Sequence, residues 1–598
     1  MNKKLSAALI LVMVFTLLLS ACGATPEPEV VEVEKVVTQV VQETVKETVI
    51  VEGTPEVVER EVEVEKVVTA TPEPMQPEGT VVVGVWQEPS GLIWNIFYEA
   101  HTNDILDSMY YAPVALDEND ELIPELLTEI PTVENGGISE DGLTYTLKFK
   151  DGVKWHDGEP VTAEDFAFTW QFIIDPATLS QVSVGWDSID SVEVPDPLTA
   201  VVKLKETYVP FVSAVLASSI LPKHALEGVP DPGNSDFARN PIGNGSFIFQ
   251  EWVPGDRITV VANPDALKPP KVETIIFKMV PDMNTLIALL RTGDVDIAYD
   301  LRELQIAEVL KMDGVEPYVI PGVSIERYYF NLRDPEDLTQ PHPIFSDINV
   351  RKAIAMGMDR FTAVSSILQG YGEVAVTELD NHPWFNEELE PVPYDPEAAM
   401  ALLDEAGWVD SDGDGIRDKD GVPLSFGHST TSGNQVRENL QVFFQQNLKD
   451  IGVDMQIENY PGSTLFGGCA DNGIFGTSNF DMMGFTNRPA FIDMAQEWTD
   501  FFLCESIRNC ETNPSGSNAW GYCNEEGNEL LQCAISETDP DQRLACIKDA
   551  QAVIYDDIPA LYVYDRLDVY AANERISGFN PTVFGSLTWN YDEWSVNE

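Results

Sequence analysis

Strand-like and helix-like runs alternate along the chain from residue 80 onward. Residues 272–280 (VETIIFKMV) and 453–460 (VDMQIENY) carry the β-branched and aromatic residues typical of strands. Residues 284–293 (NTLIALLRTG) and 434–452 (NQVRENLQVFFQQNLKDIG) carry apolar side chains at helical spacing. This alternation predicts an α/β fold. Because 598 residues are too many for one hydrophobic core, we expect several domains.

The first 22 residues have the pattern of an export signal. Lys3 and Lys4 precede an apolar stretch, residues 5–19, that is of signal-peptide length and short for a membrane span. It ends in Leu-Ser-Ala-Cys, which resembles the bacterial lipobox. The resemblance implies that Cys22 carries a diacylglycerol, so that membrane lipid anchors an extracytoplasmic protein to the cell membrane. An ordinary signal peptide with a chance cysteine is the alternative.

Residues 23–78 consist mostly of Glu, Val, Thr and Pro and contain no aromatic residue. The octapeptide VEVEKVVT occurs at 31–38 and again at 62–69. A segment of this composition cannot build a core, so we predict a tether between the membrane and the globular part. The valine spacing does not decide between strand and helix, and a coiled coil that assembles oligomers is the alternative.

The net charge of the chain limits the classes of molecule that it can bind. The sequence has 35 Lys and Arg against 100 Asp and Glu, a formal net charge of −65. Such a chain repels polyphosphate, so we expect no nucleic-acid partner.

One long block carries a specific resemblance. Residues 139–170 read SEDGLTYTLKFKDGVKWHDGEPVTAEDFAFTW, with an alternating strand, two Asp-Gly turns and a helix for which Thr162 is the predicted N-cap. This block resembles the signature of the family 5 extracellular solute-binding proteins of ABC transporters, which include oligopeptide-, dipeptide- and nickel-binding proteins. Further matches follow in the family's order, at residues 240–247, 286–297, 330–332, 349–356 and 394–408.

The resemblance extends from about residue 80 to the C-terminus and implies the fold. That fold is α/β and two-lobed, of the periplasmic-binding-protein type, with a hinge and an additional third domain. The expected division is a leader (1–22), a tether (23–78), lobe I (79–113, 236–322 and 561–598), domain II of the enlarged lobe (114–235) and lobe III (323–560).

The resemblance also implies a binding function and not an enzyme. We expect a short peptide in the cleft between the lobes, permease subunits of an ABC importer as partners, and no required cofactor. An oligosaccharide or a nickel complex is the alternative ligand, and a surface hydrolase with a carboxylate pair is a remote one. The sequence has no His-Glu-x-x-His, Walker or Gly-x-Ser-x-Gly motif, and its six histidines are scattered singly.

Four residues are the candidates for ligand contact. The family's peptide binders place an Asp after a Tyr/Phe-Asp-Met strand, where it pairs with the ligand's α-ammonium, and Asp493 is the positional match here. Arg488 could instead face a ligand carboxylate. Trp86 and Phe485 could cover apolar side chains, with ordinary core packing as the alternative.

Residues 410–418 (DSDGDGIRD) have the spacing of a calcium loop. Carboxylates at positions 1, 3, 5 and 9 and a carbonyl at position 7 would surround a hard cation, with Gly415 at the turn. Gly421 stands where a bidentate Glu is expected. The predicted structural calcium ligands are Asp410, Asp412, Asp414, Ile416 and Asp418. A solvated acidic turn is the alternative.

Six further cysteines all fall within residues 469–546. An even number in an exported chain predicts three disulfides, with 15 possible pairings. A four-cysteine zinc site is the alternative, although the spacings are long for it. The candidates are Cys469, Cys504, Cys510, Cys523, Cys533 and Cys546.

Overall fold

The computed structural model describes residues 36–51, 54–69, 77–97, 99–183, 185–299, 301, 303–469, 472–487, 493, 495–585 and 589–597. The chain divides into two units at residues 76 and 77. Cys22 and Arg488 lie outside the described residues, so lipidation and the predicted carboxylate contact stay predictions.

The first unit contains a β-hairpin. Strands β1 (Val36–Val51) and β2 (Thr54–Thr69) pair antiparallel, from Val36 opposite Thr69 to Val51 opposite Thr54. The sequence left strand and helix open for this segment. These residues are strands, not the helices of a coiled coil.

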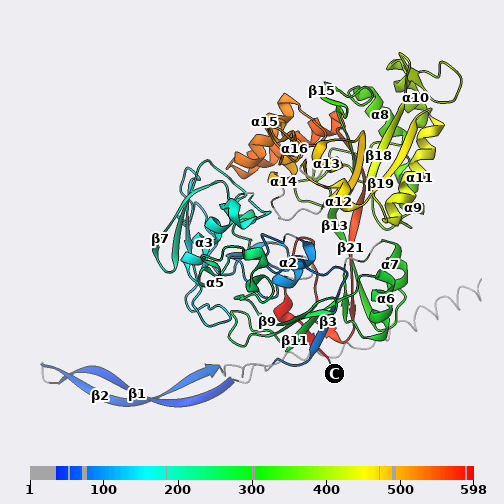
Figure 1. The fold of residues 1–598 in the computed structure, drawn as a ribbon. Helices are drawn as coiled ribbons and strands as arrows, with labels where there is room; N and C mark the ends of the chain where they lie inside the picture. Colours follow the sequence, from blue (N-terminus) through cyan, green and yellow to red (C-terminus); the bar gives the residue numbers. More distant parts are fainter. Residues whose placement is uncertain are drawn as a thin grey trace, which may run out of the picture. The chain divides into compact units, whose positions relative to one another are not determined.

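The second unit is built around a ten-stranded mixed sheet in the order β19-β18-β20-β13-β21-β12-β3-β11-β10-β9 (Figure 1). The strand bounds are β3 (Thr80–Val85), β9 (Phe247–Val253), β10 (Arg257–Ala262), β11 (Thr274–Met279), β12 (Ile297–Ala298), β13 (Val315–Phe330), β18 (Ser425–Thr431), β19 (Asp454–Tyr460), β20 (Met482–Asn487) and β21 (Ala560–Asn573). Parallel pairs (β3 with β11, β18 with β19) and antiparallel pairs (β13 with β21) both occur, as the α/β prediction allows.

The hydrophobic cores show the two lobes. One core draws on β3, β9–β11 and the C-terminal segment around Trp594. Another draws on β18–β20 and the helices α8 (Ile348–Gly357) and α11 (Gln435–Asp450). The long strands β13 and β21 contribute to both cores, so they join the lobes. The two-lobed α/β fold that the resemblance implied is confirmed.

A smaller three-stranded sheet lies within the segment predicted as domain II. It consists of β6 (Thr144–Lys148), β8 (Thr199–Leu204) and β7 (Ile189–Asp196), and α3 (Ala163–Ile174) packs against it. Thr162 is the N-cap of α3, as predicted, and its N–H donates to the Asp165 carboxylate at 2.8 Å. The exact domain boundaries stay predictions.

Helices and short strand pairs complete the second unit. The remaining helices are α2 (Ala100–Leu106), α4 (Phe211–Ala214), α5 (Lys223–Leu226), α6 (Met283–Thr292), α7 (Glu303–Val309), α9 (Arg360–Ser366), α10 (Pro396–Glu405), α12 (Gly462–Leu465), α13 (Ile474–Thr477), α14 (Ala495–Asp500), α15 (Glu525–Ser536) and α16 (Pro540–Asp557). The short pairs are β4 (Val114–Leu116) with β5 (Leu122–Pro124), β14 (Arg333–Asp334) with β15 (Asp337–Pro341), β16 (Asp418–Lys419) with β17 (Val422–Pro423), and β22 (Ile576–Ser577) with β23 (Ser595–Val596). Across the described ranges, no helix combines the length and the apolar character that a membrane crossing needs.

Candidate ligand-binding site

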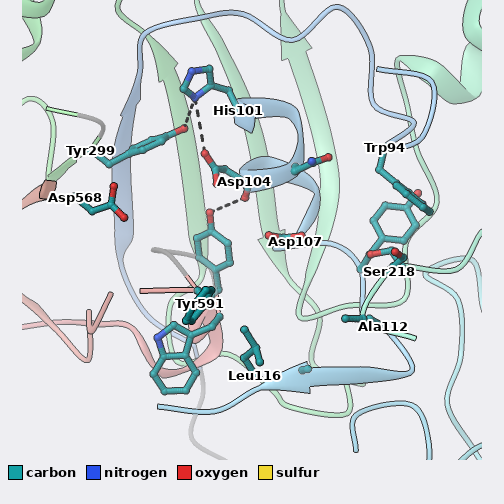
Figure 2. Close-up of a pocket in the computed structure, with 18 of the residues that line it drawn as sticks. Trp94, His101, Asp104, Asp107, Ala112, Leu116, Ser218, Tyr299, Asp568 and Tyr591 are labelled. Carbon is teal, nitrogen blue, oxygen red and sulfur yellow. Dashed lines mark hydrogen bonds and ion pairs between the residues drawn. The ribbon is translucent and has the colours of Figure 1, made fainter. Parts of the chain in front are cut away.

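A cavity of about 660 Å³ lies in the second unit. Its wall comes from segments far apart in the sequence: the residue after β3, helix α2, the β4–β5 region, the chain after β12, strand β21 and the C-terminal segment (Figure 2). Ser324 of β13 and Thr486 of β20 also line it. The cavity therefore meets both the strands that join the lobes and a strand of the second lobe.

An irregularity in the joining strands contributes to the cavity wall. The register between β13 and β21 shifts after Pro321, which pairs with Leu567, and resumes where Ile325 pairs with Asp565. Ser324 and Arg566 fall in this interruption, and both line the cavity. An interruption in strand pairing changes the direction in which nearby side chains point. This explains how residues of two paired strands line the cavity.

Trp86 lies in the cavity wall, where the sequence predicted a ligand contact. Its ring meets the His101 ring edge-on, with centroids 4.6 Å apart. His101 is buried, and its Nδ1 lies 3.0 Å from Oη of Tyr299 and 3.8 Å from the Asp104 carboxylate (Figure 2). Trp86 is thus placed to contact a ligand, and the contact itself stays a prediction.

Helix α2 brings two carboxylates to the cavity. Asp104 lies in its last turn and Asp107 is its C-cap residue. The Tyr591 hydroxyl donates to the Asp104 carbonyl oxygen at 2.8 Å (Figure 2). Burial, and then the charges of Asp104 and Asp107, raise the pKa of Tyr591 well above its ordinary value. Asp104 and Asp107 thus both line the cavity, as Tyr591 does.

An ion pair lies at another part of the wall. The Lys268 ammonium is 2.9 Å from the Glu125 carboxylate, which also accepts from the N–H of Ala112 at 3.0 Å. Burial lowers the pKa of Lys268, but the charge and hydrogen bond of Glu125 outweigh it and the pKa is raised. Burial raises the pKa of Asp592 nearby.

No sequence pattern pointed to His101, Asp104 or Tyr299. They stand singly, without a spacing that indicates a site, and only the fold brings residues 86, 101 and 299 together.

Asp493 has a protein partner. Its two carboxylate oxygens each lie 2.8 Å from a guanidinium nitrogen of Arg543 in α16, and both side chains are about nine-tenths buried. Arg543 also lies over the Trp384 ring, 5.0 Å from its centroid. Asp493 is not among the residues that line the cavity. In this structure its charge is balanced by Arg543, and the predicted contact with a ligand ammonium stays a prediction.

Phe485 packs in a core of the second lobe. Its ring centroid lies 5.4 Å from that of Tyr329 and 5.5 Å from that of Phe466. Only 7% of Phe485 is exposed, and it does not line the cavity, whereas the next residue, Thr486, does. Core packing, the alternative reading of Phe485, is what the structure shows.

The Asp-rich loop brings three carboxylates together. Ligand oxygens of Asp410, Asp412 and Asp414 lie within 4.8 Å of one another, on exposed side chains. Asp410 accepts from the N–H groups of Gly413 and Gly415, and Gly415 has φ +93°, which favours glycine. These three residues could hold a cation.

Asp418 and Ile416, the other two predicted calcium ligands, form hydrogen bonds within the loop. Asp418 accepts from both the N–H and the hydroxyl of Ser411, and these hydrogen bonds lower its pKa. Ile416 donates its N–H to the Asp414 carboxylate at 2.8 Å.

The three predicted disulfides are present. The pairs are Cys469–Cys510, Cys504–Cys523 and Cys533–Cys546. The zinc alternative is therefore wrong, because all six sulfurs are in disulfide bonds. The last pair links α15 to α16, the helix that also carries Arg543.

Solved structures share this fold. The oligopeptide-binding protein AppA from Bacillus subtilis, in complex with a nonapeptide, superposes with a TM-score of 0.72 at 28% identity, over 88% of this chain and 100% of its own. NikZ from Campylobacter jejuni, in complex with Ni(L-His), has a TM-score of 0.74 at 24% identity, over 87% of this chain and 100% of its own. The second likeness concerns the fold alone.

Comparison of amino-acid sequences also finds similarity to AppA and to a second peptide-binding protein. AppA of Bacillus subtilis is 29% identical over 87% of this chain and 92% of its own length. The dipeptide-binding protein of Escherichia coli is 24% identical over 77% of this chain and 84% of its own. Residues 121–498, more than half of the chain, match the profile of the bacterial extracellular solute-binding proteins, family 5 Middle. The chain therefore belongs to the family 5 bacterial extracellular solute-binding proteins.

Proposed function

We propose that this protein captures short peptides in the cavity and delivers them to the permease of an ABC importer, without catalysing a reaction. The similarity to the oligopeptide-binding protein AppA over 87% of the chain carries the proposal. AppA's solved structure holds a nonapeptide in the same fold.

The cavity supports this function physically. Its volume of about 660 Å³ lies within the range of small-molecule sites, roughly 300–1,000 Å³. It offers hydroxyl groups, carboxylates and an ammonium group to a ligand's polar atoms. An extended peptide carries many backbone donors and acceptors, and leaving one of them buried without a partner costs about 1–3 kcal/mol. A wall with many polar groups is therefore suited to a peptide backbone.

The test is to identify the ligand that accompanies the protein. Mass spectrometry of the purified full-length protein should find peptides, and calorimetry with a peptide pool should show binding with a 1:1 stoichiometry. Peptides recovered after incubation should be intact, because a hydrolase would shorten them. An oligosaccharide or a nickel complex in place of peptides would contradict the proposed ligand.

We further propose that Cys22 carries a lipid and that residues 23–78 tether the globular part to the membrane. The Leu-Ser-Ala-Cys ending of the leader supports the lipid site. Replacing Cys22 by Ala should move the protein from the membrane fraction to the soluble fraction. A wild-type protein as soluble as the variant would contradict the anchor.

A structural calcium ion at residues 410–418 is a separate proposal. The three clustered carboxylates of Asp410, Asp412 and Asp414 support it. Calcium-dependent thermal stability of the loop tests it.

A further inference from the structure

We infer that the cavity selects peptides with a basic side chain, and that Asp104 and Asp107 of α2 receive its positive charge. This inference rests on the proposed peptide-binding function and names its substrate class.

The first observation is the charge of the wall. Among the described residues that line the cavity, only Lys268 and Arg566 carry a permanent positive charge. Six carboxylates line it, namely Glu99, Asp104, Asp107, Glu125, Asp568 and Asp592. Even if each cation neutralised one carboxylate, the wall would keep an excess of negative charge. In a partly dehydrated space this excess attracts a cation and repels an anion more strongly than it would in water.

The second observation is how the carboxylates are distributed. The acidic residues of the wall have protein contacts of their own: Glu125 pairs with Lys268 at 2.9 Å, and the Asp104 carboxylate lies 3.8 Å from Nδ1 of His101. Asp104 and Asp107 lie three residues apart on α2, which places them on neighbouring positions of one helix face. They form the closest pair of acidic residues in the wall along the sequence.

The third observation is the surroundings of that pair. Tyr591 lies against Asp104, to whose carbonyl oxygen it donates, and Trp589 lines the same cavity. Figure 2 shows Asp104, Asp107 and Tyr591 among the residues that line the cavity. A lysine or arginine side chain has an apolar stem and a charged end, so the stem can pack on an aromatic ring while the end meets a carboxylate. The wall of the cavity contains both kinds of surface.

Calorimetry on the full-length protein tests the selectivity. The probes are pentaalanine peptides in which one residue, at each position in turn, is lysine, norleucine or glutamate. Norleucine keeps the lysine stem and removes the charge. The tightest lysine peptide should bind about tenfold or more tightly than the tightest norleucine peptide, and the glutamate peptides should bind most weakly. Because the preference is electrostatic, raising the salt from low to high concentration should reduce it.

Variants test the assignment to α2. In the double variant Asp104→Asn, Asp107→Asn the affinity for the lysine peptide should fall to within about threefold of that for the norleucine peptide. A cooperative urea denaturation curve shows that the variant is folded. The matched control is Asp549→Asn, an exposed carboxylate on α16 away from the cavity wall, which should keep the full preference.

The outcomes separate two failures. If none of the peptides binds the wild type, the proposed peptide function is wrong. If lysine, norleucine and glutamate peptides bind equally, the function stands and the charge selectivity is wrong. If the lysine preference survives the double variant, the assignment to Asp104 and Asp107 is overturned.

Discussion

At the residue scale, Asp493 and Arg543 form a buried ion pair. Both side chains are about nine-tenths buried, and the two hydrogen bonds are each 2.8 Å long. Burying two charges is costly, but removing one partner is costlier, because the other charge is left without compensation.

We therefore expect Asp493→Ala to lower the free energy of unfolding by about 3–5 kcal/mol, measured by urea denaturation. The control is Glu129→Gln, which breaks an exposed pair with Lys148 and should cost less than about 1 kcal/mol. A loss for Asp493→Ala as small as the control would contradict the structural role. Such a small loss would instead support the predicted role of Asp493 in ligand binding.

A second residue-scale prediction concerns Asp565 of β21. Burial, then the carboxylates of Asp380 and Glu373, raise its pKa from 3.8 to about 8. The folded state therefore holds the proton more tightly than the unfolded state does. The stabilisation is complete below about pH 4 and is lost as the pH rises through about 8.

Asp565→Asn cannot ionise, so it should be more stable than the wild type at pH 8, by on the order of 5 kcal/mol, and similar to it at pH 4. Urea denaturation at pH 4, 6 and 8 measures the difference. Asp549→Asn, at an exposed position, should show no such pH dependence. A difference between Asp565→Asn and wild type that is equal at all three pH values would rule out titration of Asp565 as the cause.

At the element scale, the loop between α10 and β16 is the candidate for calcium. A single bound ion raises stability by about 2.7 kcal/mol at a concentration 100-fold above its Kd. Thermal melts in millimolar calcium and in chelator should then differ for the wild type. Asp412→Ala removes one of the three clustered carboxylates and should abolish the difference. Identical wild-type melts would show that the loop is a solvated acidic turn.

The disulfide between α15 and α16 is also an element-scale feature. Cys533 and Cys546 are 13 residues apart in the sequence, so their bond restricts a short loop in the unfolded chain. Replacing both by Ala should lower the free energy of unfolding by about 3 kcal/mol. Alkylation gives the count of bonds: six thiols of residues 469–546 should react only after reduction. Reactive thiols in the native protein would contradict the three bonds.

At the scale of the whole molecule, the candidate site is built from segments that lie far apart in the chain. The cavity wall uses residues from Trp86 to Asp592, and it lies where β13 and β21 join the two cores. A ligand bound there would contact residues on both sides of this junction. The acidic character of the chain as a whole, −65, recurs in the wall of the cavity.

Local sequence patterns were enough to predict the class of fold and several local structures. Alternating strand and helix patterns predicted α/β architecture, Thr162 marked the start of α3, and six cysteines behind a predicted export signal predicted three disulfides. Periodicity and capping depend on residues that are close together in the sequence, and the number of cysteines can be counted directly. None of these features requires knowledge of the tertiary structure.

Only the tertiary structure decided the disulfide pairing, the partner of Asp493 and the composition of the cavity. Arg543 lies 50 residues from Asp493, and Tyr591 lies 487 residues from Asp104. The interruption that brings Ser324 and Arg566 to the wall arises from pairing between strands more than 200 residues apart. Such contacts are decided by how whole elements pack, because local spacing carries no information about which distant segment an element meets.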